Sequence, residues 1–437
     1  MDLHIKGGNK TFNIETSIPG DKSIGHRSLI IGAIPKGKYK IYNFSFSEDC
    51  NTTLDTIKKL GVDVKEILEE DKKVLNVFSP GYENFNRNIL EINANNSGTT
   101  ARLILGLLSG TNVNTVITGD DSLSKRPMNR VLNPLISMGA KFECSNGYLP
   151  IKINNNNGIN GIKYEMPVDS AQVKSAILIA GFFSKDKTIV IEKNKTRNHT
   201  EKMFKYLGSN IKVNENKITI SNSKLISKDI YVPGDPSTAA FLIVATIISK
   251  DSSILIKDVL LNKGRLKYVE ILKNMGANIE IIEKGFRNEE PIGDIVAFSS
   301  NLSGITIEHS EIASIIDEIP ILSVAAAFAN GETIFENVEE LKYKESNRIN
   351  AMEINLAKAN IKTSLDNDYN FKVIGNNQDI ESDVKFDSYN DHRIALASLV
   401  LAIKNKGNTL IKNYECTNIS FPNSLKYFKS IINIEEM

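Results

Sequence analysis

An internal repeat runs through this chain and limits its fold more than any other pattern. Each copy has a polar or Gly/Asp opening, an apolar stretch with helical character, a glycine or lysine stop and a short β-branched strand. The openings are Gly20-Asp21-Lys22-Ser23, Asn96-Ser97-Gly98-Thr99, Asp169-Ser170-Ala171-Gln172, Gly234-Asp235-Pro236-Ser237, Asp317-Glu318-Ile319-Pro320 and Asn390-Asp391-His392-Arg393. Their aspartate or asparagine markers lie 66 to 82 residues apart. The repeat predicts six similar units.

The order of elements within each copy predicts an α/β protein. Alternating strands and helices usually indicate a doubly wound parallel sheet, but no GxGxxG segment follows a first strand and no P-loop is present. Six small sheets around helical cores fit the repeat better. At 437 residues two domains are expected, with three units in 21–234 and three in 1–20 plus 235–437. The two crossovers near Gly20 and Gly234 are expected to act as a hinge.

Composition excludes several classes of function. The chain has 53 basic and 52 acidic residues, so no overall field attracts nucleic acid or an anionic membrane. The three cysteines are far apart and show neither a disulfide framework nor a zinc-site spacing. The sequence shows no apolar signal region and no run near the ~18 apolar residues of a membrane span. These features predict a cytoplasmic protein that binds neither nucleic acid nor membrane.

The openings predict anion sites, because a helix N-terminus presents free N–H groups and partial positive charge. In the first opening we expect Gly20 to adopt a φ that other residues avoid and Asp21 to cap the helix. Cations lie in or beside the openings at Lys22, Arg27, Arg102, Arg126, Arg130, Arg197, Lys344, Arg348 and Arg393. Hydrogen-bonding neutral residues accompany them at Ser23, Asn96, Thr99, Ser170 and Gln172. Each residue alone also fits a solvated cation or a simple cap, whereas the repeated set favours a site for a phosphate or carboxylate.

Two acidic residues are candidates for proton transfer. Asp317 opens an apolar helix, and Glu345 lies between Lys344 and Arg348. A carboxylate among cations can accept a proton from an alcohol, and a second one can deliver a proton elsewhere. The structural alternatives are an N-cap for Asp317 and an i,i+3 partner of Arg348 for Glu345. No motif for a covalent nucleophile or a metal is present.

Several motifs resemble those of one enzyme family, and they follow the same order in the chain. They are Pro19–Arg27, Asn96–Arg102, Lys125-Arg126-Pro127-Met128, Ser170-Ala171-Gln172-Val173-Lys174, Arg197-Asn198-His199-Thr200-Glu201, Ile316–Pro320, Lys344–Arg348 and Tyr389–Arg393. Over nearly its full length the chain resembles the 5-enolpyruvylshikimate-3-phosphate synthase family, also called 3-phosphoshikimate 1-carboxyvinyltransferases. The Ser-Ala-Gln-x-Lys and Arg-x-His-x-Glu patterns are similar to the second of its two sequence classes.

The resemblance implies a two-domain, inverted α/β fold of six repeated βαβαββ-type units, with pseudo-threefold symmetry in each domain. It implies transfer of the enolpyruvyl group of phosphoenolpyruvate to the 5-hydroxyl of shikimate 3-phosphate, with release of phosphate and without metal or organic cofactor. Residues implied to hold shikimate 3-phosphate are Lys22, Ser23, Arg27, Ser170, Ala171, Gln172, Arg197, Asp317 and Lys344. Those implied to surround phosphoenolpyruvate are Lys22, Asn96, Gly98, Arg126, Gln172, Arg348 and Arg393.

The resemblance also implies catalytic roles. Asp317 takes the proton of the 5-hydroxyl, and Glu345, with Lys22, protonates C3 of phosphoenolpyruvate. Domain closure would assemble the cationic lining and exclude water. We expect a monomer.

Two positions bear on the phosphoenolpyruvate site. Many family members carry a lysine in a Cys-Thr-x-Lys-Thr-Phe-Pro pattern, where this chain has Ile419. An isoleucine cannot donate to a phosphate, so that contact is absent or comes from elsewhere. Gly98 matches the glycine with which family members generally admit the herbicide glyphosate, so we expect a glyphosate-sensitive enzyme.

The sequence leaves two alternative functions open. A sister enzyme, the UDP-N-acetylglucosamine enolpyruvyl transferase, shares the six-unit fold but typically uses a reactive loop cysteine, and no cysteine here lies in such a basic loop. A non-catalytic anion-binding module is the second alternative; it would release no phosphate from the two substrates.

Overall fold

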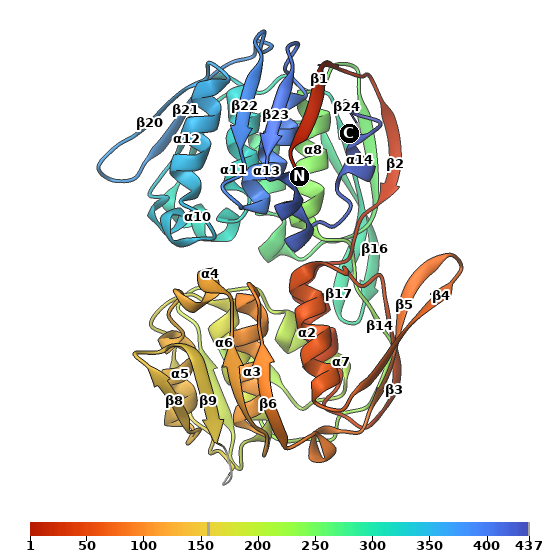
Figure 1. Ribbon diagram of the computed structural model, residues 1–437, viewed down its shortest axis with the longest axis vertical. Helices are drawn as coiled ribbons and strands as arrows, with labels where there is room; N and C mark the ends of the chain where they lie inside the picture. Colours follow the sequence, from red (N-terminus) through yellow and green to blue (C-terminus); the bar gives the residue numbers. More distant parts are fainter. Residues whose placement is uncertain (155–157, 436–437) are drawn as a thin grey trace. The chain divides into compact units, whose positions relative to one another are not determined.

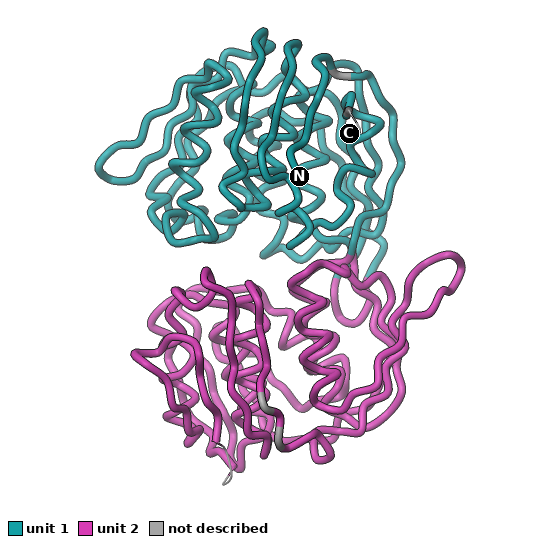
Figure 2. The backbone as a smooth tube through the Cα atoms, viewed as in Figure 1, with its two compact units in different colours: residues 1–19, 234–285, 291–437 teal, residues 20–233, 286–290 magenta. Residues whose placement is uncertain are grey.

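The chain forms two compact units, which are coloured separately in Figure 2. The computed structural model describes residues 1–154 and 158–435. Unit 1 consists of Met1–Pro19, Gly234–Gly285 and Pro291–Met437, and unit 2 consists of Gly20–Pro233 and Phe286–Glu290. The sequence-based division differs from these units by one residue at each crossover and by the short segment Phe286–Glu290. That segment lies in unit 2, where its Glu290 forms ion pairs with His199 and Lys202.

Unit 2 contains three four-stranded sheets among its described residues (Figure 1). In spatial order the first consists of β14 (Ile230–Tyr231), β3 (Gly37–Tyr42), β5 (Lys72–Ser79) and β4 (Asp63–Glu69). The second consists of β6 (Asn88–Asn93), β7 (Asn114–Thr118), β9 (Tyr148–Asn154) and β8 (Phe142–Ser145). The third consists of β10 (Lys163–Glu165), β11 (Thr188–Ile191), β13 (Lys217–Ile220) and β12 (Lys212–Asn214).

Unit 1 likewise has three four-stranded sheets in the part of it that the structure describes. The first consists of β2 (Asn13–Ser17), β15 (Ser253–Leu260), β17 (Glu290–Phe298) and β16 (Ile279–Arg287). The end of β16 and the first residue of β17 belong to the segment Phe286–Glu290 and so to unit 2. The second consists of β18 (Thr306–Ile307), β19 (Asn330–Phe335), β21 (Phe371–Asn376) and β20 (Lys362–Leu365). The third consists of β22 (Val384–Asp387), β23 (Thr409–Lys412), β1 (Leu3–Asn9) and β24 (Ile432–Glu435).

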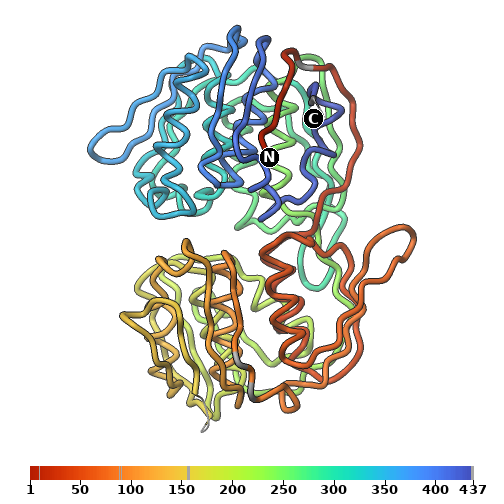
Figure 3. The backbone as a smooth tube through the Cα atoms, viewed as in Figure 1, coloured from red at the N-terminus to blue at the C-terminus, as the bar shows by residue number. Residues whose placement is uncertain are grey.

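The six sheets share one pattern, in which the first two strands run parallel and the second and third run antiparallel. In the last sheet the third position is occupied by β1, which pairs with β23 and β24 (Figure 3). The N-terminal strand thus completes the sixth unit, whose own segment ends at the C-terminus. The predicted α/β fold of six repeated units is confirmed.

The helices divide into inner and outer sets. In unit 2 they are α1 (Lys22–Ile30), α2 (Glu48–Lys59), α3 (Gly98–Ser109), α4 (Asp121–Ser124), α5 (Asn129–Ser137), α6 (Ala171–Phe183) and α7 (His199–Tyr206). In unit 1 they are α8 (Pro236–Ile248), α9 (Lys267–Asn274), α10 (His309–Ile315), α11 (Ile319–Ala327), α12 (Arg348–Lys358), α13 (His392–Ala402) and α14 (Leu425–Phe428). The inner helices are those that follow the repeated openings. Among them, α8 and α11 are apolar on all sides because sheets and other helices surround them, whereas α1 also buries the polar His26 and Arg27.

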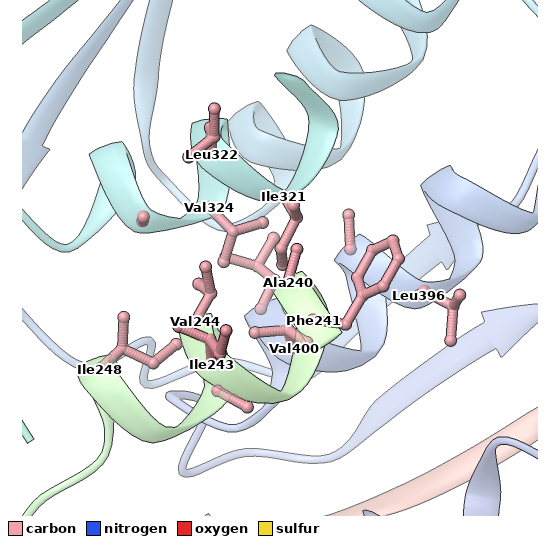
Figure 4. Close-up of a cluster of buried hydrophobic side chains, with 14 of the residues drawn as sticks. Ala240, Phe241, Ile243, Val244, Ile248, Ile321, Leu322, Val324, Leu396 and Val400 are labelled. Carbon is pink, nitrogen blue, oxygen red and sulfur yellow. The ribbon is translucent and has the colours of Figure 1, made fainter. Parts of the chain in front are cut away.

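The core of unit 1 forms where three inner helices meet (Figure 4). Phe241 and Val244 of α8 lie beside Ile321 and Val324 of α11, and Val400 of α13 closes the cluster. In unit 2, α3 packs on both α1 and α6. The N-termini of inner helices also meet within each unit. In unit 1 Glu318, at the start of α11, accepts from Ser237 of α8 and lies 3.6 Å from Nη1 of Arg393 in α13. In unit 2 Gln172 of α6 binds Thr99 and Arg102 of α3.

The glycine of the first opening has a different function from the one expected. The φ of Gly20 lies outside the left-handed region, so the residue is not needed for an unusual backbone conformation. A Cβ at this position would lie 2.0 Å from the carbonyl oxygen of Asn43 and 2.7 Å from Cγ1 of Val232. Gly20 therefore permits a close backbone approach inside unit 2.

Within the described ranges, none of the helices combines the length and apolar character that crossing a membrane requires.

Candidate active site

The first opening of unit 2 is a capped helix start that carries a charged pair. The Asp21 carboxylate accepts a hydrogen bond from the backbone N–H of Ile24 at 2.8 Å, which caps α1 as predicted. Lys22 follows the cap, and its Nζ lies 2.6 Å from Oδ2 of Asp49 in α2. The Lys22 side chain remains partly exposed. The opening thus presents an ammonium group at a helix N-terminus, with one carboxylate already beside it.

Arg27 is a buried cation whose hydrogen-bond partners are all neutral. Its guanidinium donates to Thr200 Oγ1 at 2.7 Å, to Ser175 Oγ at 2.6 Å and to the carbonyl oxygen of Ser23 at 2.8 Å. Only 3% of the residue is exposed. Burial lowers the pKa of Arg27 to about 10, and the more distant Glu201 opposes that shift. An anion bound here would compensate a charge that the protein leaves without an ion-pair partner.

The third opening is joined to the second by Gln172. Ser170 caps α6, and Ala171 and Gln172 form its first turn. The Gln172 amide accepts from Arg102 Nη1 at 2.9 Å and donates to Thr99 Oγ1 at 3.0 Å. Arg102 and Thr99 belong to α3, so these hydrogen bonds hold the starts of α3 and α6 next to each other.

The second opening leaves little room at Gly98. This residue begins α3, and a Cβ there would lie 2.7 Å from Nη1 of Arg102. Asn96, just before it, donates to Oδ2 of Asp120 at 2.6 Å. Arg126 lies after α4 and donates to Ser122 Oγ at 3.4 Å. A larger residue at Gly98 would displace the guanidinium that binds Gln172.

A chain of buried hydroxyl groups connects α1 to the start of α3. His26 Nδ1 lies 2.6 Å from Thr53 Oγ1, which lies 2.6 Å from Thr100 Oγ1. Thr100 in turn donates to Ser97, the N-cap of α3, at 2.8 Å. Burial lowers the pKa of His26 to about 3, so this imidazole is neutral at physiological pH. His26 therefore orients the second opening and adds no charge to the first.

In unit 1, Arg348 gathers three carboxylates. It begins α12 and is only 1% exposed. Its Nε lies 2.8 Å from Oδ2 of Asp391, its Nη2 lies 2.5 Å from Oε2 of Glu345, and its Nη1 lies 3.5 Å from Oδ1 of Asp317. Burial alone would lower the pKa of Arg348, but the three carboxylates outweigh it and raise that pKa above its usual value. Nη1 makes no hydrogen bond to any described residue.

Asp317 lies in the turn between α10 and α11, not at the helix cap. The N-cap position of α11 belongs to Glu318. The Asp317 carboxylate lies near Arg348 and 3.8 Å from Nη2 of Arg393, while its carbonyl oxygen accepts from Arg393 Nη1 at 2.6 Å. About a quarter of the Asp317 side chain is exposed, and so is about a quarter of the Glu345 side chain. The structural alternative for Glu345, an i,i+3 contact with Arg348, is present, and it places both carboxylates on the same guanidinium.

Two further predicted positions lie beside this cluster in sequence. Lys344 follows a 3-10 turn at Glu339–Tyr343, is half-buried, and has no hydrogen-bond or ion-pair partner among the described residues. Ile419 ends the 3-10 turn Tyr414–Ile419 and is half-buried.

The predicted residues are divided between the two units. Unit 2 holds Lys22, Ser23, Arg27, Asn96, Gly98, Arg126, Ser170, Ala171, Gln172 and Arg197, and unit 1 holds Asp317, Lys344, Glu345, Arg348 and Arg393. Direct contacts among the predicted residues connect Ser23 with Arg27 and connect Asp317, Glu345, Arg348 and Arg393.

Sequence reasoning missed the groups that hold these residues. Asp391 binds Arg348 and caps α13 through the backbone N–H of Arg393 at 2.9 Å. Asp391 marks the sixth opening in the sequence, which signalled a cap but gave no sign of its ion pair. Of the partners of Arg27, Thr200 lies within one motif and Ser175 directly follows another, but neither carries a charge that would draw attention to it. In the described part of the chain, no group of three His, Cys, Asp or Glu side chains is arranged to hold a metal ion.

Comparisons with known proteins agree on one family. The family model described as EPSP synthase (3-phosphoshikimate 1-carboxyvinyltransferase) matches residues 7–427. A Clostridium tetani protein named 3-phosphoshikimate 1-carboxyvinyltransferase is 50% identical over 432 residues, 99% of this chain and 97% of that protein. A protein of the same name from Petrotoga mobilis is 44% identical, over 97% of this chain and 98% of its own. A 2.37 Å structure of EPSP synthase from Acinetobacter baumannii has a TM-score of 0.89 and 34% identity, with 99% of each chain covered.

Proposed function

The chain belongs to the EPSP synthase family, and on this premise we propose which of its residues carry out the reaction. The enzyme transfers the enolpyruvyl group of phosphoenolpyruvate to the 5-hydroxyl of shikimate 3-phosphate and releases phosphate, a step of aromatic amino acid biosynthesis. The UDP-N-acetylglucosamine alternative and the non-catalytic alternative are not favoured, since the matches cover nearly the whole chain at up to 50% identity.

Shikimate 3-phosphate is held mainly by cations and hydroxyl groups of unit 2. Arg27 supports this assignment most strongly, because its buried charge has only neutral hydrogen-bond partners. Arginine offers a planar fork that matches a phosphate group. The remaining ligands in this proposal are Lys22, Ser23, Ser170, Ala171, Gln172, Arg197, Asp317 and Lys344. The ammonium group of Lys344 has no partner among the described residues, so it can bind another oxygen of the same substrate. The backbone N–H groups at the starts of α1 and α6 can do so as well.

Phosphoenolpyruvate is held by a second set that shares Lys22 and Gln172. The other members are Asn96, Gly98, Arg126, Arg348 and Arg393. Arg348 supports this assignment because its Nη1 has no hydrogen-bond acceptor among the described residues. An incoming carboxylate or phosphate would supply one. Ile419 supplies no ammonium group, so binding relies on these arginines and Lys22.

Asp317 and Glu345 divide the proton transfers. Asp317 takes the proton of the 5-hydroxyl as its oxygen attacks C2 of phosphoenolpyruvate. Glu345, with Lys22, delivers a proton to C3, which gives a tetrahedral intermediate. Removal of a proton from C3 and cleavage of the C2–O bond to phosphate then yield the product. The observation that carries this proposal is that both carboxylates lie against one buried guanidinium, at 3.5 and 2.5 Å from Arg348 nitrogens.

The test is phosphate release after mixing the protein with both substrates. We expect Asp317→Asn and Glu345→Gln to lower kcat by ~10²–10⁴-fold, the usual contribution of a general acid or base. Asp379→Asn is the matched control, because Asp379 is an ion-paired carboxylate of unit 1 with Lys404 and Lys406 as its partners. Its turnover should equal that of the wild type. Full turnover by Asp317→Asn would remove that residue from its role.

The two substrates are both anions, so we propose that the units close on them about the crossovers near Gly20 and Gly234. Closure would exclude water and strengthen each charge contact. Small-angle scattering should show a smaller radius of gyration with both substrates than without them. An unchanged radius would argue against closure.

The remaining parts of the proposal concern the whole protein. We propose a cytoplasmic monomer that uses no metal or organic cofactor and is inhibited by glyphosate. Sedimentation at assay concentration should give a single species of about 48.4 kDa. Cell fractionation should place the activity in the cytoplasm, and prolonged chelation should leave kcat unchanged. An inhibition constant for glyphosate far above the Kd for phosphoenolpyruvate would contradict the last point.

A further inference from the structure

The loop that carries Arg197 is fixed at its base by buried charges. This loop connects β11 to α7, and three charged residues meet beneath it: Lys174 of α6, Glu192 at the start of the loop and Glu201 of α7. The exposed fraction of their side chains is 0% for Lys174 and 5% for each glutamate. None of the three side chains is placed to touch a substrate from solvent.

The contacts of these residues converge on Thr196, the residue before Arg197. Lys174 Nζ lies 3.0 Å from Oε1 of Glu192 and 2.7 Å from Oε1 of Glu201. The same Oε1 of Glu192 accepts the backbone N–H of Thr196 at 2.9 Å and also its hydroxyl group. Lys174 Nζ further donates to the carbonyl oxygen of Thr196 at 3.5 Å. The N–H, the carbonyl oxygen and the hydroxyl of Thr196 are therefore all held by the buried pair.

The loop is also tied to the start of α6. The Asp169 carboxylate accepts the backbone N–H of Asn194 at 3.0 Å and its side-chain amide at 2.7 Å. Asp169 directly precedes Ser170, and Lys174 follows Gln172 by two residues in α6. The segment Ser170–Gln172 and the loop 193–198 are thus connected at two places inside unit 2.

Buried charges need a specific reason to be present. Taking ions out of water is costly, and a well-packed apolar group at such a site is often as stable as an ion pair. The pair of Lys174 and Glu192 instead fixes a backbone conformation, because charged hydrogen bonds to a loop backbone restrict that backbone to a narrow range of positions. The residue whose course is fixed here is Arg197, the next in the chain after Thr196.

We propose that Lys174 and Glu192 are positioning residues that hold Arg197 in place for the phosphate group of shikimate 3-phosphate. This inference rests on the proposed role of Arg197 as a ligand of that phosphate. Glu201 completes the site by pairing with Lys174 from α7, the helix that follows the loop.

The main experiment is a double-mutant cycle between Glu192→Gln and Arg197→Ala, with KM measured for each substrate. Glu192→Gln keeps an oxygen acceptor for Thr196 and loses the charge. We expect it to raise KM for shikimate 3-phosphate roughly tenfold, the range of one charged hydrogen bond. KM for phosphoenolpyruvate and kcat should stay within about twofold. In the Arg197→Ala background the same substitution should change KM for shikimate 3-phosphate by less than about twofold, because its target is gone.

Two further variants separate a positioning role from general damage. Thr196→Val has nearly the same shape but lacks the hydroxyl group, so it should raise the same KM by about threefold even if Glu192→Gln folds poorly. Asp294→Asn is the matched control, since Asp294 is a buried carboxylate of unit 1 that also accepts a backbone N–H, at 3.0 Å from Asp258, and a lysine, at 2.7 Å from Lys284. It should leave both KM values unchanged.

The outcomes distinguish the two claims. If Arg197→Ala leaves KM for shikimate 3-phosphate unchanged, the proposed ligand role of Arg197 fails, and the positioning claim fails with it. If Arg197→Ala raises KM but Glu192→Gln raises it by the same factor with or without Arg197, only the positioning claim is overturned. Equal effects on the two substrates, or an equal effect of Asp294→Asn, would also overturn it.

Discussion

Arg27 of unit 2 and Arg348 of unit 1 are both buried arginines at a proposed substrate site, yet they are held in opposite ways. Arg27 donates to two hydroxyl groups and a carbonyl oxygen, and burial lowers its pKa to about 10. Arg348 is surrounded by Asp391, Glu345 and Asp317, which overcome the effect of burial and raise its pKa. Arg27 has no carboxylate partner among the described residues, whereas the protein compensates most of the charge of Arg348 and leaves only its Nη1 without a hydrogen-bond acceptor in the described part of the chain.

The difference teaches that a basic residue near a helix start does not by itself mark a binding site for a phosphate. At Arg348 the protein uses the cation to assemble carboxylates, which suits proton transfer. At Arg27 it uses hydroxyl groups to hold a cation without cancelling its charge, which suits anion binding. These partners support the proposed division, in which proton transfer relies mainly on unit 1 and binding of shikimate 3-phosphate mainly on unit 2.

The largest effect that this comparison predicts is on the stability of unit 1. Arg348→Gln would leave the buried Asp391 without the cation of Arg348 and would remove the same cation from the partly exposed Glu345 and Asp317. Breaking a buried pair in this way costs ~3–5 kcal/mol. Urea unfolding followed by circular dichroism should show that loss at neutral pH. Lowering the pH should recover part of it, because protonation of the carboxylates removes the uncompensated charge. A loss below ~1 kcal/mol would mean that the cluster is not held by Arg348.

Acid should affect unit 2 through His26. The pKa of His26 falls from 6.5 to about 3 on burial, so the unfolded chain binds the proton more readily than the folded one. Stability from this group is therefore full above pH 6.5 and declines as the pH falls toward 3. Between pH 7 and pH 5 the loss should be ~2 kcal/mol, and His26→Asn should lack it. Parallel pH profiles for the two proteins would refute a buried neutral imidazole.

Gly98→Ala tests a third arginine, Arg102, whose partner at the start of α3 is the neutral amide of Gln172. The added Cβ would lie 2.7 Å from Nη1 of Arg102 and push it away from Gln172. Because the displaced group is the flexible end of a side chain, we expect the binding free energy of phosphoenolpyruvate to weaken by only ~1 kcal/mol. This loss corresponds to a roughly fivefold higher KM for phosphoenolpyruvate. Inhibition by glyphosate should weaken as well. Gly264→Ala is the control, since its Cβ would meet only Asn262 Oδ1 at 3.5 Å.

The smallest effect should come from Arg27→Gln on stability. The variant loses three hydrogen bonds but no longer buries a cation that lacks a carboxylate partner. Thr200 and Ser175 also keep each other, at 2.7 Å, and Ser175 keeps the carbonyl oxygen of Ala171. We therefore expect the free energy of unfolding to change by less than ~1 kcal/mol. A loss comparable to that of Arg348→Gln would erase the contrast between the two residues.

The fold could be predicted largely because its repeat is local. Each opening, helix and strand lies within one stretch of sequence, so six units and their α/β character were readable without any long-range pairing. Two features depend on distant contacts and could not be read in that way. The strand β1 completes the last sheet, and Glu290 enters unit 2 through its ion pairs with His199 and Lys202.

The candidate site shows the same limit. Motifs identified the charged residues, but not the partners that decide what each charge does. Asp391 reaches Arg348 across 43 positions of sequence, and Arg27 meets Thr200 across 173. Gly20 was explained by backbone freedom, whereas its neighbour Asn43 leaves no room for a side chain. Such distinctions depend on packing between segments, which single motifs do not encode.

The most direct test is the Kd of Arg27→Gln for shikimate 3-phosphate, measured by titration calorimetry without phosphoenolpyruvate. If the guanidinium of Arg27 binds the phosphate group of the substrate, the variant should bind shikimate 3-phosphate ~10–100-fold more weakly, in keeping with the loss of a charged hydrogen bond. Its free energy of unfolding should stay close to that of the wild type. A Kd within about twofold of the wild type, in a protein that is folded, would contradict the account.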